Sequence, residues 1–172
     1  MEFIFTEGCG FDKYSEEILN MLTNADNEFV PPLSSRSSTT QKGFEEQVKG
    51  DGIKLYFEEM KKQKFVIAVE NDKVLGFVCY KENLINDYVK NTPNIYISTL
   101  IVSPSSRGKG MTKRMYEALF EKYKSSYVYT RTWSTNLAHI GILGKFGFET
   151  VMVLKNHRGN GIDTVCFEKK NN

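Results

Sequence analysis

The alternation of apolar and polar positions predicts a series of strands from residue 64 onward. Residues 64–70 (KFVIAVE) and 73–80 (KVLGFVCY) are short apolar runs separated by Asn71-Asp72, which predicts an antiparallel hairpin. Residues 95–102 (IYISTLIV) are rich in β-branched side chains and predict a central strand. Residues 127–133 predict another strand, and residues 149–155 and 163–169 predict a final pair around a Gly-rich loop.

Helical spacing of apolar residues fills the intervals between these strands. Residues 107–124 predict a helix whose apolar stripe comprises Met111, Met115, Ala118, Leu119 and Tyr123. Residues 136–146 predict a second, shorter helix. In the first third of the chain, we expect a short strand at 3–5, a helix at 14–23, a Pro- and Ser/Thr-rich loop at 29–40, and a helical region at 44–62 that is interrupted at 50–52.

This order of elements indicates an α/β fold. We expect a mixed sheet of about six or seven strands with flanking helices, which is a common size for one sheet. The chain has 172 residues, enough to bury a core, and we expect a single domain over residues 1–172.

Composition and charge remove several classes of function. Apolar residues make up 40% and charged residues 26%, as in ordinary globular proteins, and the net charge of +2 does not suggest nucleic acid or an anionic membrane as a partner. The three cysteines lie far apart, which is a poor disulfide framework and favours a reducing, cytoplasmic setting. Neither a signal peptide nor an apolar run of about 20 residues is apparent.

Residues 103–112 (SPSSRGKGMT) form the segment with the clearest chemical meaning. A strand ends, a loop with two glycines follows, and a helix begins, so unpaired amides at the helix start would favour an anion. Arg107, Lys109, Lys113 and Arg114 gather there, although the helix dipole disfavours each cation by roughly 0.3–1 kcal/mol. A bound polyphosphate would make these positions favourable for cations. An exposed basic surface that binds no ligand is an equally weighted interpretation of the same residues.

Two other phosphate-binding motifs fit this loop less well. A P-loop requires G-x-x-x-x-G-K-[ST], whereas Met111 follows Gly110. A dinucleotide fingerprint requires G-x-G-x-x-G, whereas Lys113 stands three residues after Gly110. Neither motif is therefore present.

The segment LIVSPSSRGKGMT resembles the acetyl-CoA loop of the GNAT N-acetyltransferase superfamily, whose pattern is R/Q-x-x-G-x-G/A. Arg107 and Gly110 fill its first and fourth positions, and Thr112 stands where Gly or Ala is usual. A second segment, STNLAHIGILGKFGF, resembles the family's N-x-x-A-x-x-L-Y-x-K-x-G-F pattern. Its matching positions are Asn136, Ile142, Lys145, Gly147 and Phe148.

The resemblance implies a GNAT-like sheet that is splayed between its fourth and fifth strands, at 95–102 and 127–133. Acetyl-CoA, as co-substrate, would pair its pantetheine with the fourth strand, place its pyrophosphate on the loop amides, and meet one side-chain amide after the fifth strand. No metal is implied. The residues that this assigns to acetyl-CoA are Leu100, Ile101, Val102, Arg107, Gly108, Lys109, Gly110, Met111, Thr112 and Asn136.

The usual catalytic side chains of the family are missing from their usual places. Leu143 stands where many members have a tyrosine that protonates the leaving thiolate, and Ser98 and Thr99 stand where many have a carboxylate. His139 is the candidate catalytic residue, because it shares a helix face with Asn136 and imidazole titrates near working pH. A role in packing is the alternative for this histidine.

For the acceptor, the resemblance points to residues 29–40 and 157–163. Arg36 or Arg158 could hold a substrate carboxylate and Asp163 an amine, although ordinary turn chemistry is also open. We expect an N-acetyltransferase that moves an acetyl group directly to a primary amine of a small molecule, amino acid or peptide, as a monomer or homodimer without nucleic acid or membrane. A non-catalytic acyl-CoA-binding regulatory module is the alternative, and a nucleotide-binding regulator is the third hypothesis.

Overall fold

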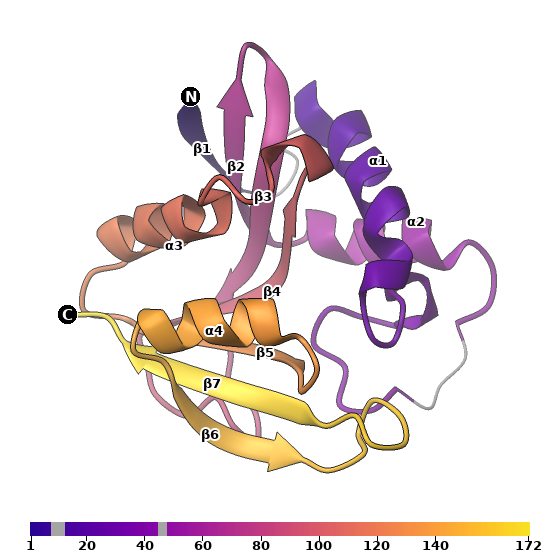
Figure 1. Ribbon diagram of the computed structural model, residues 1–172, viewed down its shortest axis with the longest axis vertical. Coiled ribbons are helices and arrows are strands. Elements are labelled where there is room, and N and C mark those ends of the chain that lie inside the picture. The colour runs from indigo at the N-terminus through magenta and orange to yellow at the C-terminus, as the bar shows by residue number, and fades with distance from the viewer. Residues whose placement is uncertain (8–12, 45–47) are drawn as a thin grey trace. The chain divides into compact units, whose positions relative to one another are not determined.

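The computed structural model describes residues 1–7, 13–44 and 48–172 (Figure 1). These residues form two compact units. The first unit comprises Met1–Tyr80 and Thr99–Leu119, and the second comprises Lys81–Ser98 and Phe120–Asn172. Each unit contains some of the strands of one seven-stranded sheet.

The sheet of the first unit is built on an antiparallel hairpin. Strand β1 (Glu2–Glu7) pairs antiparallel with β2 (Lys64–Glu70), and β2 pairs antiparallel with β3 (Lys73–Glu82). Asn71 and Asp72 connect β2 to β3 with φ of 50° and 58°. These left-handed conformations suit a two-residue hairpin and are tolerated by Asn and Asp. The hairpin predicted from the sequence is thus confirmed.

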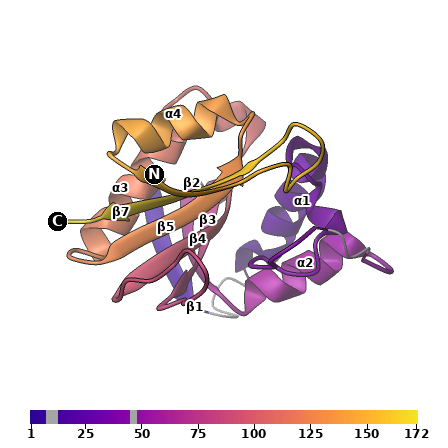
Figure 2. The ribbon, with the colours of Figure 1, turned by 90° about the horizontal axis from the view of Figure 1, so that it is seen from below.

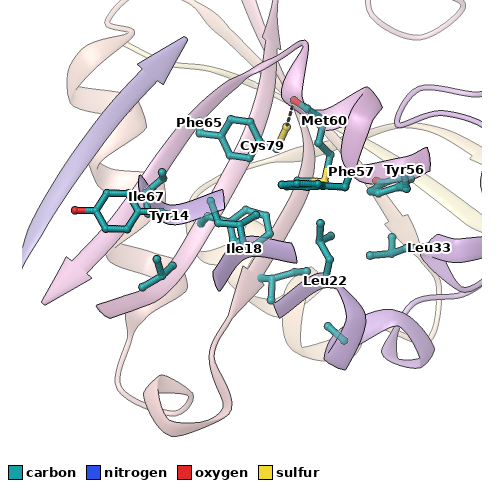
Figure 3. Packing of buried hydrophobic residues seen from close by; sticks show 14 of the residues in the cluster. Tyr14, Ile18, Leu22, Leu33, Tyr56, Phe57, Met60, Phe65, Ile67 and Cys79 are labelled. Carbon is teal, nitrogen blue, oxygen red and sulfur yellow. Dashed lines mark hydrogen bonds between the residues drawn. The ribbon is translucent and has the colours of Figure 1, made fainter. Parts of the chain in front are cut away.

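The core of the first unit lies between β2–β3 and the helices α1 (Ser15–Ala25) and α2 (Gly52–Lys61). Figure 3 shows Ile18 and Leu22 of α1 and Met60 of α2 among the aromatic rings of this cluster. All three side chains are fully buried, and burial of each contributes about 1.5–3 kcal/mol. The Cys79 thiol donates a weak hydrogen bond to the Met60 carbonyl at 3.8 Å, so this cysteine is a buried core residue.

Helix α2 begins later than the helical region expected at 44–62. Asp51 caps it by accepting a hydrogen bond from the Lys54 amide at 3.3 Å. Gly52 packs so closely on the short helix η3 (Leu33–Ser35) that an added Cβ would lie 1.7 Å from the Ser34 carbonyl oxygen. The glycines at 50–52 therefore mark the start of the helix, and the part of the expected helix at 45–47 lies outside the described residues.

The second unit contains a parallel strand pair. Asn94–Ile97 of β4 (Asn94–Val102) pairs parallel with β5 (Tyr127–Trp133), which pairs antiparallel with β7 (Thr164–Lys170). Strand β6 (Glu149–Leu154) completes this part of the sheet against β7. Helix α4 (Leu137–Lys145) lies on one face of β5 and β7 in both views (Figures 1 and 2).

Strand β4 runs through both units, since residues 99–102 belong to the first and residues 94–98 to the second. The hydrogen-bonded strand order is β1-β2-β3-β4-β5-β7-β6. The expected mixed α/β sheet of six or seven strands is confirmed with seven. Helix α3 (Met111–Lys122) packs on the first unit's sheet, where Met115 lies against Gly76 of β3.

Candidate acetyl-coenzyme A site

The glycine loop of the first unit connects the end of β4 to α3 through a short helix, η4 (Pro104–Ser106). Helix α3 begins at Met111, four residues later than expected, because Gly108 and Gly110 both adopt φ of +72°. This left-handed backbone favours glycine and cannot continue a right-handed helix. An added Cβ at either glycine would meet no atom within 4 Å, so the space beside the loop is open.

The amides of this loop point to an anion site. Within the described part of the chain, no backbone carbonyl accepts a hydrogen bond from the amides of residues 108–113. Residues 107–110 are exposed, so the start of α3 is not covered within its own unit. A run of backbone donors at a helix N-terminus, reached by glycines, matches the geometry that holds phosphate groups.

The cations around this loop are partly engaged with the protein itself. The Arg107 guanidinium donates from Nε to the Val102 carbonyl at 3.1 Å and from Nη2 to Glu28 Oε1 at 3.0 Å. Lys109 Nζ donates to the Ser105 carbonyl at 2.8 Å. Arg107 thus ties the loop to the end of β4 and to Glu28, and the exposed Lys109 stays beside the open amides.

The predicted pantetheine-binding residues occupy the end of β4 in the first unit. Ile101 and Val102 are buried and Leu100 is half-buried. The Ile101 carbonyl lies so close to Gly76 that an added Cβ there would be 2.9 Å away. Thr99, one candidate position for the family's carboxylate, is buried and its hydroxyl lies 2.7 Å from that of Tyr56.

In the second unit, the β4–β5 pairing covers Asn94 to Ile97 and Tyr127 to Thr130. At its last pair, the Thr130 hydroxyl donates to the Ile97 carbonyl at 3.1 Å. A side chain therefore satisfies a carbonyl at the point where the described parallel ladder stops.

Asn136 is the N-cap of α4. Its Oδ1 accepts from the His139 amide at 3.3 Å, and its Nδ2 donates to the Thr132 hydroxyl at 3.0 Å. The side chain is half-buried. Contact of Asn136 with pantetheine stays a prediction. The structure gives a separate, local reason for an asparagine here, since asparagine is among the best N-cap residues.

The two residues discussed for proton transfer lie further along α4. Leu143 is fully buried, so it is a core residue. His139 lies in the first turn and is half-buried, and burial lowers its pKa to about 4. Its imidazole is therefore neutral at neutral pH.

The three residues that the sequence suggested for binding the acceptor, Arg36, Arg158 and Asp163, lie in different local environments. Arg36 is buried and donates to the Pro31 and Val30 carbonyls, and its guanidinium carbon lies 5.5 Å and 5.4 Å from the centres of the Phe29 and Phe44 rings, so it organises its own loop. Asp163 accepts from Lys155 Nζ at 2.8 Å, and this hydrogen bond lowers its pKa. Arg158 is buried over Trp133.

Tyr129 of β5 is fully buried. It donates to Glu168 and accepts from Asn91, and burial raises its pKa. It is therefore a core residue. Arg131 was not identified from the sequence, and its neighbours become apparent only through strand pairing.

Taken together, a mixed sheet with a parallel β4–β5 pair and a glycine loop that opens α3 define an acyl-CoA-dependent acyltransferase class. The sequence model of the acetyltransferase (GNAT) family matches residues 28–148, which is more than half of the chain, and the protein belongs to this family. Enzymes of this family use acetyl-CoA as co-substrate, as the sequence resemblance predicted.

Solved structures show the same fold. The ribosomal-protein-alanine N-acetyltransferase from Brucella melitensis is 16% identical with a TM-score of 0.66, and the match covers 99% of both chains. The structure of yncA from Salmonella typhimurium with acetyl-CoA is 14% identical with a TM-score of 0.65, covering 100% of this chain and 94% of that one. An N-acetyltransferase from Staphylococcus aureus Mu50 is 19% identical with a TM-score of 0.61 over 100% of both chains.

A comparison with curated proteins finds no match. Across the described ranges, no helix has the length and apolar character that crossing a membrane requires. The same residues contain no group of three or more His, Cys, Asp or Glu side chains placed to hold a metal ion.

Proposed function

We propose that the protein is a single-domain N-acetyltransferase that moves the acetyl group of acetyl-CoA directly to a primary amine of a small molecule, amino acid or peptide. The observation that carries this proposal is the row of open amides at residues 108–113, presented by two glycines with left-handed backbone. Those donors suit the pyrophosphate of coenzyme A.

We expect the remaining contacts with acetyl-CoA to come from residues before and after this loop. Backbone groups of Leu100, Ile101 and Val102 would pair with the pantetheine arm, and Thr112 would add its amide to the pyrophosphate site. The Asn136 side chain would contribute an amide to pantetheine. The Arg107 guanidinium forms an exposed ion pair with Glu28 at 2.9 Å, which contributes at most about 1 kcal/mol to the loop conformation.

The chemistry needs little from acid–base side chains. A neutral amine attacks the thioester carbonyl carbon, a C–N bond forms, the C–S bond breaks, and coenzyme A leaves as its thiolate. The proton of the amine passes to water. Positioning of the two reactants can lower the barrier by roughly 7–11 kcal/mol, which suits a site where Leu143 and the Tyr56-bonded Thr99 replace the family's acid and base.

His139 remains the candidate catalytic residue. With its pKa lowered to about 4 by burial, the imidazole would act as a neutral group that orients the amine or a water molecule. It would be too weak a base to hold a proton taken from an ammonium group.

Thiol release and cofactor binding test the proposal separately. Acetyl-CoA should raise the unfolding temperature of the purified protein, because a ligand at about 100 times its dissociation constant stabilises the folded state by about 2.7 kcal/mol. A panel of amines should then release free thiol from acetyl-CoA. No stabilisation by coenzyme A or acetyl-CoA would contradict the proposed site.

The alternative function is a non-catalytic acyl-CoA-binding module. The buried Leu143 and the Tyr56–Thr99 hydroxyl pair favour it, because they remove the two usual proton-transfer positions. Binding of acetyl-CoA without thiol release for any amine would support this alternative and exclude transfer.

A further inference from the structure

One face of β5 and β7 in the second unit gathers basic and aromatic side chains. Arg131 lies directly opposite Cys166, and Trp133 lies opposite Thr164. Because cross-strand partners share a face and alternate residues return to it, these four side chains lie on the same side of the sheet. We call this set, together with Arg158, the arginine face.

Arg158 reaches the arginine face from the loop between β6 and β7. Its Nε donates to the Thr164 hydroxyl at 2.8 Å, and its guanidinium carbon lies 5.9 Å from the centre of the Trp133 ring. His157 Nδ1 lies 2.8 Å from the same hydroxyl. A buried guanidinium held by a hydrogen bond and an aromatic ring is an oriented fork, which loses little freedom when it binds a planar anion.

The guanidinium groups of Arg131 and Arg158 both affect the pKa of Cys166. Burial raises the pKa of the Cys166 thiol to about 11, and Arg131 and Arg158 both oppose that rise. Arg131 likewise opposes the rise that burial causes in the pKa of Tyr88, whose hydroxyl donates to that of Tyr96 at 2.8 Å. Both guanidinium groups therefore act on the region around Cys166, where water is partly excluded and ionic attraction is strong. The Glu168 carboxylate on the same face is bound by Tyr129 and Asn91.

The arginine face lies on the side of β5 opposite to Asn136. Thr130 and Thr132 alternate with Arg131 and so lie on the opposite face, where Asn136 contacts Thr132 at the start of α4. Arg131 follows Thr130, the last β5 residue in the described pairing with β4.

We propose that the arginine face is the acceptor subsite and that Arg131 and Arg158 bind a carboxylate carried by the acceptor. The acceptor would then be a small amine that also bears a carboxylate, such as a free amino acid, with Trp133 packing against it. This inference rests on the proposed acetyltransferase function and adds the chemical class of the acceptor.

Fluorescence of Trp133 tests the inference without requiring turnover, because this is the only tryptophan in the chain. The protein, saturated with coenzyme A, is titrated at constant ionic strength with pairs of amines that differ only in the carboxylate: leucine against 3-methylbutylamine, and lysine against cadaverine. We expect a saturable change with the amino acids and binding weaker by at least about tenfold without the carboxylate. Equal responses to both members of each pair, or no response to either, would overturn the inference.

Three variants test whether the carboxylate preference depends on Arg131. Arg131→Gln, at a half-buried position, should abolish the preference for the carboxylate, and Arg131→Lys should restore part of it, since Lys keeps the charge without the planar fork. Lys122→Gln, at an exposed position on α3, removes the same charge elsewhere and should leave the preference intact. An unchanged preference in Arg131→Gln would contradict the assignment.

Thiol release separates this inference from the proposed function. Decarboxylated amines that react as fast as the amino acids would overturn the carboxylate subsite while supporting acetyl transfer. A carboxylate-dependent Trp133 response with no thiol release from any amine would support the subsite and contradict acetyl transfer.

Discussion

The glycine loop of the first unit would bind its ligand with backbone amides, whereas the arginine face of the second unit would bind its ligand with side chains. The loop offers backbone amides from consecutive residues, and its shape comes from two glycines with φ of +72°. The arginine face offers side chains from β5, β7 and the loop before β7, which strand register brings together. A backbone site should therefore be sensitive to conformation, whereas a side-chain site should be sensitive to charge and to hydrogen-bonding groups.

The largest expected effect is at the glycine loop. Gly110→Val places a β-branched side chain at φ of +72°, and such strain costs on the order of 1–3 kcal/mol. The loop can relieve that strain only by changing the direction of its amides. We therefore expect acetyl-CoA to bind about 10–100 times more weakly, as measured by calorimetry.

Gly141→Val is the matched control for this substitution. Gly141 lies in the middle of α4 without a positive φ, and an added Cβ there would meet no atom within 4 Å. Its acetyl-CoA affinity should stay near that of the unmodified protein. Equal losses at Gly110 and Gly141 would contradict a role for the left-handed backbone of the loop.

A smaller but measurable effect is expected from His139 in the second unit. Its folded-state pKa of about 4 lies below the ordinary value of 6.5, so the folded protein binds this proton less readily than the unfolded chain. Stability from this group is fully present above pH of about 6.5 and is lost as the pH falls toward 4. The loss by pH 5 is about 2 kcal/mol in the free energy of unfolding.

Urea unfolding at pH 7.5 and pH 5 should detect this loss. His139→Gln should lose less stability between the two conditions than the unmodified protein. His157→Gln, which removes the only other histidine, should keep the dependence that His139 provides. Identical pH dependence in the unmodified protein and in His139→Gln would show that burial of this imidazole is not linked to folding.

The features of the first unit and of β5 that depend on local sequence were predicted correctly. The bounds of β2 and β5 agree with the predicted strands, and the glycine loop lies where its motif placed it, because all of these signals are local. The predicted start of α3 was wrong by four residues because helical periodicity says nothing about the φ of Gly108 and Gly110.

The arginine face could be predicted only in part. The alternation in YVYTRTW places Arg131 and Trp133 on one side of a strand, and Arg158 was considered for a carboxylate. Nothing local in the sequence indicates that Thr164 would hold Arg158, because that contact depends on the fold of the loop and on the β5–β7 register. Sites made of side chains from separate strands need the register before they can be recognised.

A third prediction separates structure from binding at Asn136. Asn136→Ala removes the cap of α4 and should cost about 1 kcal/mol in the free energy of unfolding. Asn136→Asp keeps an oxygen acceptor for the His139 amide, so its stability should remain close to that of the unmodified protein. Its carboxylate cannot donate a hydrogen bond, however, so acetyl-CoA affinity should fall in both variants. Full affinity in Asn136→Asp would show that the side-chain amide does not contact the cofactor.

The smallest expected effect is a gain in stability at Gly141. Glycine in a helix interior is less favourable than alanine by about 0.5–1 kcal/mol, and the space around Gly141 is open. Gly141→Ala should therefore raise the free energy of unfolding by up to about that amount, whereas Gly110→Ala should lower it, because alanine disfavours φ of +72°. Urea unfolding of the two variants compares the same chemical change in two backbone conformations. If both variants gained stability, the left-handed conformation of Gly110 would not be intrinsic to the folded loop, and the open amides would have to be organised by the ligand instead.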